Sequence, residues 1–386
     1  MKQEETNMPS DNLILMMKDI PVMRINKDTL LYNVISEVHV PYQIKGRLRD
    51  YIYDESKGVQ YNAIQMAKSA SKCRDVVISF LSSRVLSLDR ENAKKVLGLL
   101  QLEQAQTLEY RAKVALTCRA VSLQDNYWVK LEGESIKWAD VDIRQNKLSK
   151  IVAQVALHGS SLRLHGNVHT PELTTNGTYA KCWKQKNGEL YLYKRGLTSD
   201  RESRIEVEVS RILDKCNVRH IKYSKATDKE VYCCKCKCMT DENISMLSAY
   251  DFKAYCNVNG LDFMHEIMKI DSDSIYKMLI VDYLISNSDR HGQNWGFWYN
   301  CHTMEIISCH PLFDHNNAFD RYLMNDSTGG QSLFNGSKSM RELAHTAMGM
   351  VDFHFTKAIT EKDFIVKSHY NSFMSRAREL GIRTVS

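Results

Sequence analysis

The residues most suited to chemistry lie in a polar stretch, 287–294, which follows an apolar segment with helical spacing, Ile275 to Ile285. Within the stretch, four residues separate Asp289 from Asn294. Loops that transfer phosphoryl groups use this spacing, because the carboxylate can accept the proton of an acceptor hydroxyl while the amide oxygen reaches a metal on the nucleotide phosphates. The stretch therefore indicates phosphoryl-transfer chemistry.

A further carboxylate for a metal is available downstream at Asp314. A turn at 299–302 and a predicted strand at 305–308 lead into the segment Pro311-Leu-Phe-Asp314. Protein-bound Mg²⁺ usually rests on one or two carboxylates together with phosphate oxygens and water. Asn294 and Asp314, with a nucleotide, would complete such a coordination set.

Residues around Asp289 are expected to support the loop rather than to react. Asp282 lies within the apolar helix, where a carboxylate is expected to serve as a buried hydrogen-bonding anchor. Arg290 and His291 are expected to orient the loop, a role favoured over direct proton transfer by the histidine. The competing interpretation is an ordinary turn, since Asp, Asn and Gly favour turns without any catalytic role.

A triphosphate also needs a cation from the protein, and Lys194 is the candidate. It ends a predicted strand in which alternation places Leu190, Leu192 and Lys194 on one face. The ammonium would therefore lie at the end of an apolar face of the sheet. A hairpin turn at Asn176-Gly177 would lie over the phosphates and offer backbone N–H groups. Gly177 and Thr178 are therefore the candidate contacts to the nucleotide.

Four segments, in this order along the chain, together resemble the HipA-like kinases. The resemblance covers about residues 120–345, and the connector Ser122-Leu-Gln-Asp-Asn-Tyr-Trp128 is similar to the region before the kinase core in clostridial-type members. The segments are Gly177-Thr-Tyr-Ala-Lys-Cys-Trp183, Asn187-Gly-Glu-Leu-Tyr-Leu-Tyr-Lys-Arg-Gly196, Asn287-Ser-Asp-Arg-His-Gly-Gln-Asn-Trp-Gly-Phe297 and Pro311-Leu-Phe-Asp314.

The resemblance implies a bilobal protein-kinase-like fold, ATP with Mg²⁺, and phosphorylation of a serine or threonine in a protein, with autophosphorylation included. It also implies that the segment from Met239 to Ser248 lies near the adenine site. The roles that it implies are Lys194 as the phosphate-binding lysine, Asp289 as the catalytic aspartate, and Asn294 and Asp314 as metal ligands.

The resemblance further assigns Glu206 as the helix glutamate that pairs with the lysine. Helical geometry alone does not select it, because Glu202 and Glu208 border the same apolar stripe of the predicted helix. That stripe consists of Ile205, Val209, Ile212, Leu213 and Cys216. The first 120 residues do not resemble the domain that precedes the kinase core in the toxin members, and no antitoxin-like helix-turn-helix is evident. A toxin–antitoxin role is therefore not predicted.

Periodicity predicts an α+β protein with an antiparallel upper lobe at 151–248, a mainly helical lower lobe at 249–386, and an accessory region with a connector at 1–150. Asp89 is expected to cap the helix over 93–100. The predicted elements are a small β element within 13–40, helices within 54–118, a packed connector at 121–150, strands at 170–174, 178–185 and 189–194, a helix from Arg201 to Cys216, a strand from Ile221 to Met239, and mostly helices after Tyr250. Asn187-Gly188 is the predicted hairpin turn between the strands at 178–185 and 189–194.

Composition narrows the class of protein. The chain has 386 residues, of which 43% are hydrophobic and 25% charged, with few glycines and prolines, as in folded proteins with a sizeable core. The longest apolar run, Met278 to Val281, is far shorter than the roughly 20 residues of a membrane span. A net charge of +6 does not argue for direct nucleic-acid binding. The odd number of cysteines, 11, without a secretory signal indicates reduced thiols in a cytoplasmic protein.

Two clusters have a packing interpretation and a functional one. Four cysteines at 233, 234, 236 and 238 could ligate zinc, but alternating cysteines on a strand favour packing. Trp295, Phe297 and Trp298 could stack on bases, and core packing is again favoured. Two alternatives to a protein kinase stay open: a catalytically weak nucleotide-binding module that acts in regulation or interaction, and a lipid or small-molecule kinase.

Overall fold

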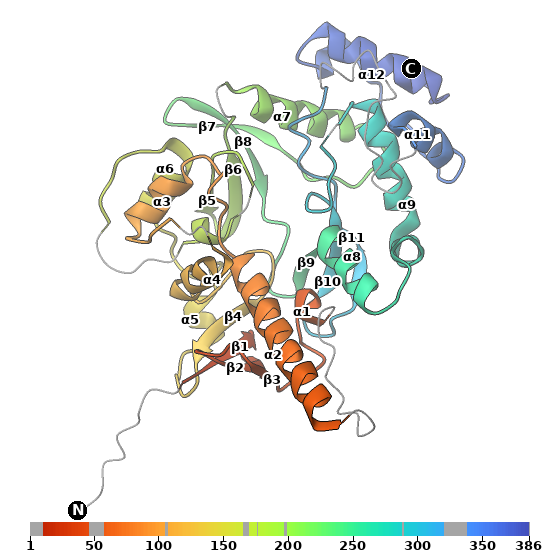
Figure 1. Ribbon diagram of the computed structural model, residues 1–386. Coiled ribbons are helices and arrows are strands. Elements are labelled where there is room, and N and C mark those ends of the chain that lie inside the picture. The colour runs from red at the N-terminus through yellow and green to blue at the C-terminus, as the bar shows by residue number, and fades with distance from the viewer. Residues whose placement is uncertain are drawn as a thin grey trace, which may run out of the picture.

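The computed structural model describes residues 11–45, 58–104, 107–164, 170–175, 177–196, 199–287, 289–319 and 338–385, with the backbone alone at 58, 59 and 61–67. Asn176 of the predicted hairpin turn lies outside these residues, as does part of the predicted lower lobe, 320–337. The fold combines helices with antiparallel sheets, so the predicted α+β class is confirmed (Figure 1).

The first sheet opens the chain and closes with a strand from the predicted connector. Its order is β3-β2-β1-β4, and all its pairs are antiparallel. The predicted β element is confirmed, although β1 is buried on both faces rather than on one. The strands are β1 (Asn12–Met17), β2 (Ile20–Asn26), β3 (Tyr32–Val34) and β4 (Tyr127–Leu131).

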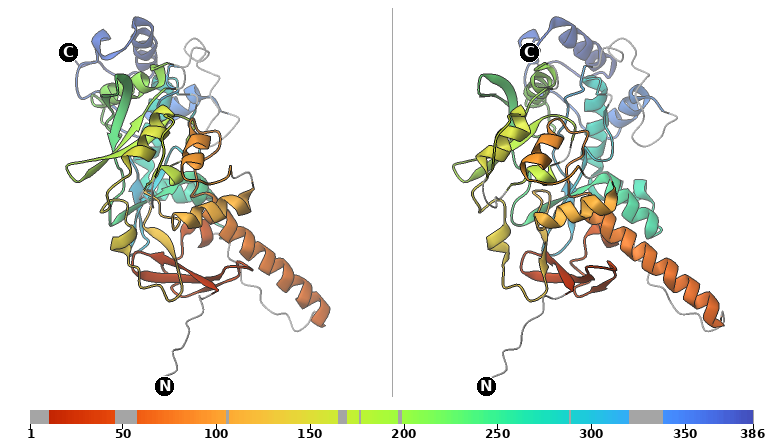
Figure 2. Two further views of the ribbon diagram at one scale, coloured as in Figure 1. Left: turned by 90° about the vertical axis from the view of Figure 1, so that its left-hand side faces the viewer. Right: turned by 60° about the vertical axis from the view of Figure 1, so that its left-hand side comes forward.

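The predicted helical region follows, and its helices are confirmed in the described residues. In two further views α2 projects away from the body of the molecule while its C-terminal end stays within it (Figure 2). Asp89 does not cap α3: Asn92 occupies the N-cap with φ 65° and no side-chain cap bond, and Asp89 accepts from Ser87 Oγ instead. The helices of that region are α2 (Gly58–Ser82), α3 (Ala93–Leu99) and α4 (Leu108–Thr117). Three further helices lie outside the predicted range: α1 (Tyr42–Lys45), α5 (Trp138–Val141) and α6 (Lys150–His158).

The second sheet has the order β5-β6-β8-β7 and carries the predicted lysine. The strands β5 (Lys181–Lys186) and β6 (Glu189–Lys194) form the predicted hairpin, with Asn187 and Gly188 both at positive φ, as a type I′ turn requires. The predicted strand at 170–174 is wrong. Pro171, without an N–H to donate, begins the 3₁₀ turn η2 (Glu172–Thr174) there.

The strand predicted from Ile221 to Met239 is two strands, β7 (Ser224–Asp228) and β8 (Val231–Lys237). The turn between them places Lys229 and Glu230 at positive φ without a glycine, which explains why the sequence pattern concealed it. The predicted order β-β-β-α-β is therefore β-β-α-β-β. The helix α7 (Arg201–Leu213) contacts this hairpin, and its predicted apolar stripe is buried.

The remaining chain is mainly helical, with a small sheet of order β11-β10-β9. The predicted apolar helix is confirmed as α9, and the stretch after it is not helical, as expected. In the described residues no helix is both long and apolar enough to cross a membrane. The elements are β9 (Ile244–Ser248), α8 (Ala249–Val258), α9 (Phe263–Leu284), β10 (Gly296–Asn300), β11 (Ile306–Cys309), α11 (Met340–Met348), η3 (Glu361–Asp363) and α12 (Lys367–Glu379).

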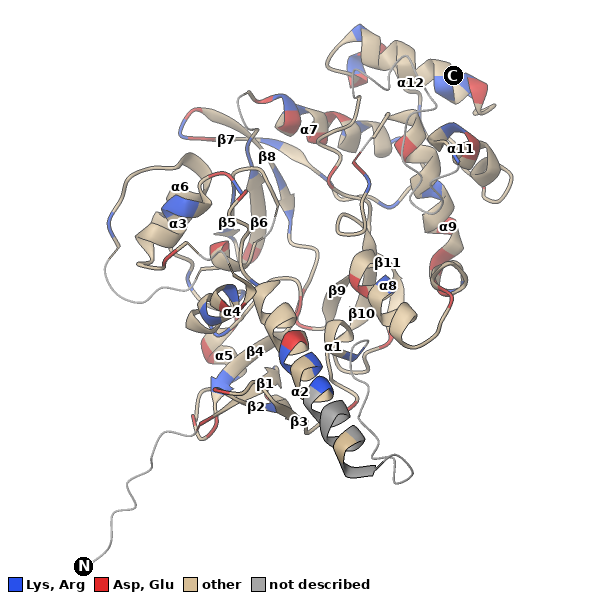
Figure 3. Ribbon diagram, in the orientation of Figure 1, with Lys and Arg blue, Asp and Glu red and all other residues tan. Residues whose placement is uncertain are grey.

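Charged residues of both signs are interspersed along the described elements (Figure 3). Exposed pairs such as Arg204–Asp200 on α7 contribute little to stability, because water screens them. Other charged residues are buried, among them Lys194 of β6 and Glu206 of α7.

Candidate active site

Three predicted residues from separate elements meet at Lys194, the last residue of β6. Its Nζ donates to Glu206 Oε1 of α7 at 2.7 Å and to Asp314 Oδ1, beyond β11, at 2.7 Å. Lys194 and Glu206 are buried, whereas the Asp314 side chain is 31% exposed. Glu206 is further held by the backbone N–H of His315, which donates to its Oε2 at 3.0 Å. The structure therefore brings the lysine, the helix glutamate and one metal-ligand candidate together.

Opposing charges set the protonation of this group. Burial alone would lower the pKa of Lys194, but the carboxylates of Asp314 and Glu206 raise it well above its ordinary value. For Asp314, burial acts to raise the pKa, and the attraction of Lys194 and Lys181 outweighs it and lowers the pKa. Lys194 is thus a cation and Asp314 an anion at neutral pH.

The loop after α9 is anchored by Asp282, as predicted. The carboxylate of Asp282 accepts from Asn287 Nδ2 at 2.9 Å, and from Arg290 Nη2 at 2.9 Å and Nε at 3.0 Å. The free arm of the guanidinium, Nη1, donates to the carbonyls of Asn294 and Phe313 at 2.9 and 3.0 Å. Arg290 therefore ties the loop of Asp289 to the segment that bears Asp314.

Asn294 is buried and oriented by its own loop. Its Oδ1 accepts from the backbone N–H of His291 at 3.0 Å, and its Nδ2 donates to the carbonyl of Asp289. A carbonyl oxygen has two lone pairs, so Oδ1 retains acceptor capacity. Together with the ionised, partly exposed carboxylate of Asp314, it provides oxygen donors of the kind that Mg²⁺ prefers.

Among the described residues, no group of three or more His, Cys, Asp or Glu side chains is placed to hold a metal ion. A metal on Asn294 and Asp314 would therefore draw its remaining ligands from phosphate oxygens and water, which is the usual arrangement for Mg²⁺. The residues present fit that ion.

Asp289 is exposed and lies beside a second amide. Its Oδ2 accepts from Asn317 Nδ2 at 2.8 Å, and Asn317 Oδ1 accepts from Tyr179 Oη at 3.3 Å. Tyr179 follows Gly177 and Thr178 in the predicted phosphate-binding segment. This chain of contacts links that segment to the predicted catalytic aspartate.

The predicted residues, apart from Glu206, line one cavity of about 720 Å³. That volume is within the usual range for small-molecule sites. Residues 237–240, at the end of β8, contribute another wall, and the N-terminal region contributes residues such as Arg84 and Arg90. The predicted residues in the lining are Gly177, Thr178, Lys194, Asp289, Asn294 and Asp314.

Sequence reasoning missed a second lysine in this cavity, Lys181 of β5, which pairs with Lys194 in the sheet register. Burial, together with the repulsion of Lys194, lowers the pKa of Lys181 to about 7. Gly177, at φ +104°, lies against it, since a Cβ there would be 2.2 Å from Lys181 Nζ. The antiparallel register of the Asn187-Gly188 hairpin was the signal that could have revealed this residue.

The cysteine cluster packs as predicted. Cys234 and Cys236 are buried with Tyr223, whose ring centre lies 5.1 Å from Lys194 Nζ. Burial raises the pKa of the Cys234 thiol well above its ordinary value, so the thiol is protonated. Trp295 and Phe297 are also buried, with ring centres 5.9 Å apart, which confirms their assignment to the core.

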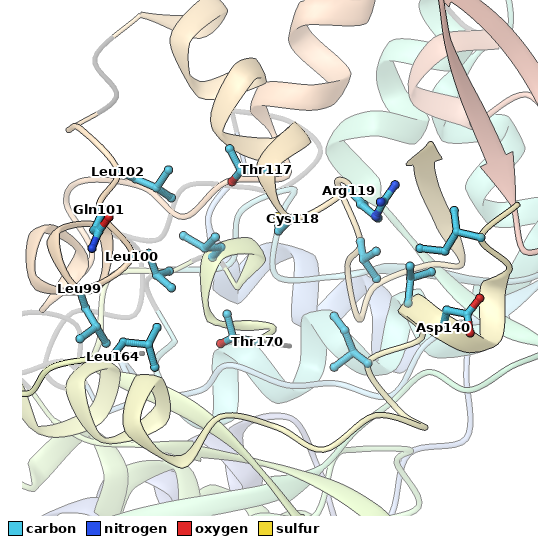
Figure 4. Close-up of a pocket in the computed structure, with 15 residues that line it drawn as sticks. Leu99, Leu100, Gln101, Leu102, Thr117, Cys118, Arg119, Asp140, Leu164 and Thr170 are labelled. Carbon is cyan, nitrogen blue, oxygen red and sulfur yellow. The ribbon is translucent and has the colours of Figure 1, made fainter. Parts of the chain in front are cut away.

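A second cavity, of about 760 Å³, is lined by residues that include Leu99, Thr117, Asp140 and Thr170 (Figure 4). Leu173 of η2 lines it, whereas Thr174 and Thr175 line the first cavity. Its wall is largely leucine, isoleucine and valine, with Leu99 from α3 and Val141 from α5 among them, and it includes none of the predicted site residues among those described.

No protein-family model and no curated protein matches the sequence. The chain is similar to a solved chain from the Shewanella oneidensis MR-1 toxin–antitoxin system of HipA, HipB and operator DNA, with a TM-score of 0.48 and 11% identity, covering 96% of this chain and 98% of that chain. It is also similar to the Helicobacter pylori proinflammatory kinase CtkA, with a TM-score of 0.35 and 12% identity, covering 52% of this chain and 87% of that chain.

Proposed function

We propose that this chain is an ATP-dependent serine/threonine protein kinase of the HipA-like type. One observation carries the proposal: Lys194 Nζ contacts both Glu206 and Asp314 at 2.7 Å, at a cavity that Asp289 and Asn294 also line. A buried lysine held between a helix glutamate and a metal-binding carboxylate is the arrangement that kinases use to position nucleotide phosphates.

In this proposal two lysines bind the phosphates. Lys194, steadied by Glu206, faces the α- and β-phosphates, and its charge is maintained by the neighbouring carboxylates. Lys181 supplies a second cation beneath Gly177. Gly177 and Thr178 border the same space, and a glycine there allows the backbone to approach the phosphates closely.

Asn294 and Asp314 would hold Mg²⁺ through their side-chain oxygens. When bound, the ion would supply positive charge that neutralises the transferring phosphoryl oxygens. Arg290 donates to the backbone carbonyls of Asn294 and of Phe313, the residue before Asp314. It therefore holds the backbones that carry Asn294 and Asp314 at a fixed spacing.

Asp289 would orient the acceptor hydroxyl and accept its proton for in-line attack. Its Oδ2 is engaged by Asn317, so an acceptor hydroxyl has to share or displace that amide. Because Asp289 is exposed, a side chain of another protein can reach it. This exposure favours a protein acceptor, in keeping with the resemblance of the motif order to protein kinases.

The proposal includes the arrangement of the chain: an upper lobe at 151–248, a lower lobe at 249–386, and an accessory region at 1–150. The second sheet and α7 belong to the first of these, and α8, α9, α11 and α12 to the second. The cavity is lined by residues from all three ranges. Nucleotide binding by the full chain is therefore the property that tests this arrangement.

The test is incubation of the full chain with labelled ATP and Mg²⁺, a set of candidate protein acceptors, and phosphosite mapping by mass spectrometry. Asp289→Asn should lower phosphate incorporation by about a hundredfold or more while nucleotide binding persists. Asp352→Asn is the control, because that side chain is 84% exposed and does not line the cavity.

Other outcomes would replace the proposal. Nucleotide binding without incorporation in the wild type would identify a binding module. Transfer to inositol-lipid vesicles or to a small alcohol, but not to protein, would identify a lipid or small-molecule kinase. Absence of nucleotide binding would refute all three.

A further inference from the structure

The segment 86–91 of the N-terminal region lies beside the segment that precedes and forms the proposed phosphate-binding loop. The backbone N–H of Leu86 donates to the carbonyl of Leu173 at 2.6 Å, and that of Glu91 donates to the carbonyl of Thr178 at 2.8 Å. Thr178 lines the cavity. The two regions are therefore joined by backbone hydrogen bonds at both ends of the loop.

The side chain of Arg90 completes this contact. Its Nη1 donates to the carbonyls of Glu172 and Thr175, each at 2.9 Å, and its Nη2 donates to the carbonyl of Lys181. Nη2 also lies 3.4 Å from Glu172 Oε2, and both charged side chains are only 1% exposed. One buried guanidinium thus holds carbonyl oxygens from before and after Gly177.

Glu172 is fixed from the other side as well. Its Oε1 accepts from the backbone N–H of Trp183 on β5 at 2.9 Å. The indole of Trp183 in turn donates to Thr175 Oγ1 at 2.9 Å. The Arg90–Glu172 pair is therefore the centre of a network that joins η2, the loop and the first strand of the sheet.

These contacts matter for an anionic ligand because a carbonyl oxygen repels phosphate. The guanidinium of Arg90 binds the carbonyl oxygens of residues 172, 175 and 181, and the backbone N–H of Glu91 binds that of residue 178. These carbonyl oxygens are therefore not free to turn toward a ligand. We propose that Arg90, paired with Glu172, is a positioning residue that shapes the phosphate-binding segment 177–181 from the N-terminal region. The inference rests on the proposed function and assigns that region a part in nucleotide binding.

Only an arginine can make this set of contacts. The planar guanidinium presents donors in a rigid fork, whereas a lysine ammonium is a single compact charge on a flexible stem. Arg90→Lys keeps the charge and loses the fork, so it tests geometry rather than charge. Glu172→Gln keeps an oxygen for Trp183 and removes the ion pair, and Glu172 does not itself line the cavity.

The experiment measures the affinities of the full-length variants for adenosine, AMP, ADP and ATP, with Mg²⁺, by calorimetry. Loss of hydrogen bonds to a charged group should weaken ATP and ADP binding about tenfold or more in Arg90→Lys, and less in Glu172→Gln, with adenosine binding unchanged. Hydrogen exchange of the nucleotide-free protein should show faster exchange over 172–183 in both variants. Arg119→Lys is the control, since Arg119 pairs with Glu134 and contacts neither segment.

The outcomes separate three explanations. Equal weakening of adenosine and ATP would show a merely structural role and overturn the inference. Phosphate-specific weakening with unchanged hydrogen exchange would mean that Arg90, which borders the cavity, contacts phosphate directly, and would also overturn it. If wild-type protein binds none of the nucleotides, the proposed function fails instead. Should Arg90→Lys not fold, Glu172→Gln and the exchange of residues 172–183 still decide.

Discussion

The side chains of Lys194 and Asp314, 120 residues apart in the chain, form a hydrogen-bonded ion pair with Nζ and Oδ1 separated by 2.7 Å. The same ammonium contacts Glu206, so one lysine joins the second sheet, α7 and the segment after β11. These two contacts hold the ammonium at one place in the wall of the cavity that Lys194 and Asp314 line.

Replacing Lys194 by methionine should lower kcat/KM for phosphate transfer by about 10² to 10³, because a charge aimed at the phosphates is lost. It also leaves the buried Glu206 without its cation, which should cost about 3 kcal/mol or more in free energy of unfolding. Steady-state kinetics and denaturant titration measure the two effects. Lys186→Met, at an exposed position on β5, is the control, and an equal loss in both variants would contradict the assignment.

Asp314→Asn and Asp289→Asn should affect the reaction in different ways. Loss of a metal ligand weakens Mg²⁺ binding, so Asp314→Asn should raise the Mg²⁺ concentration for half-maximal rate about tenfold or more. A proton acceptor acts only in the chemical step, so Asp289→Asn should lower kcat with that concentration unchanged. Rates measured over a Mg²⁺ series distinguish them, and identical Mg²⁺ profiles for the two variants would refute the separate roles.

Arg290→Lys should destabilise the protein by about 3 kcal/mol, because a buried guanidinium that contacts three residues is replaced by an ammonium that cannot reach them all. The exposed pair of Arg204 with Asp200 provides a matched comparison, and Arg204→Lys should change stability by about 0.5 kcal/mol or less. Urea denaturation followed by tryptophan fluorescence compares them. Similar midpoints for the two variants would show that Arg290 is not an anchor.

The affinity for ATP should depend on pH through Lys181. Its pKa is lowered to about 7 by burial and by Lys194, so in the free protein it is charged below pH 7 and neutral above it, and affinity should fall between pH 6 and pH 8.5. Asp314 and Glu206 act in the opposite direction, favouring the charged form. An arginine at position 181 stays charged over this pH range. Lys181→Arg should therefore abolish the part of the affinity change that comes from Lys181 and retain the part that comes from the titration of ATP itself. Parallel pH profiles for wild type and variant would exclude Lys181 as the titrating group.

Local pattern was sufficient for much of the candidate site. The spacing of Asp289 and Asn294, the anchor Asp282 and the Asn187-Gly188 turn depend on contacts within a few residues, and the structure has each where it was expected. The roles of Asp289 and Asn294 stay predictions. The 3₁₀ turn at Glu172 and the hairpin turn at Lys229 were misjudged, because the first depends on a buried long-range partner and the second lacks a glycine.

Side-chain periodicity along the chain was enough to predict the α+β class and the apolar stripe of α7, and the order of the polar segments is read directly from the sequence. Helical geometry did not choose among the glutamates of α7, and the structure has Glu206 in contact with Lys194, as the resemblance implied, whereas Glu208 binds His369 of α12. Only the tertiary structure decided that Lys181 shares the cavity and that Arg90 holds the loop 82 to 91 residues away. Such contacts depend on the path of the whole chain, which no local spacing encodes.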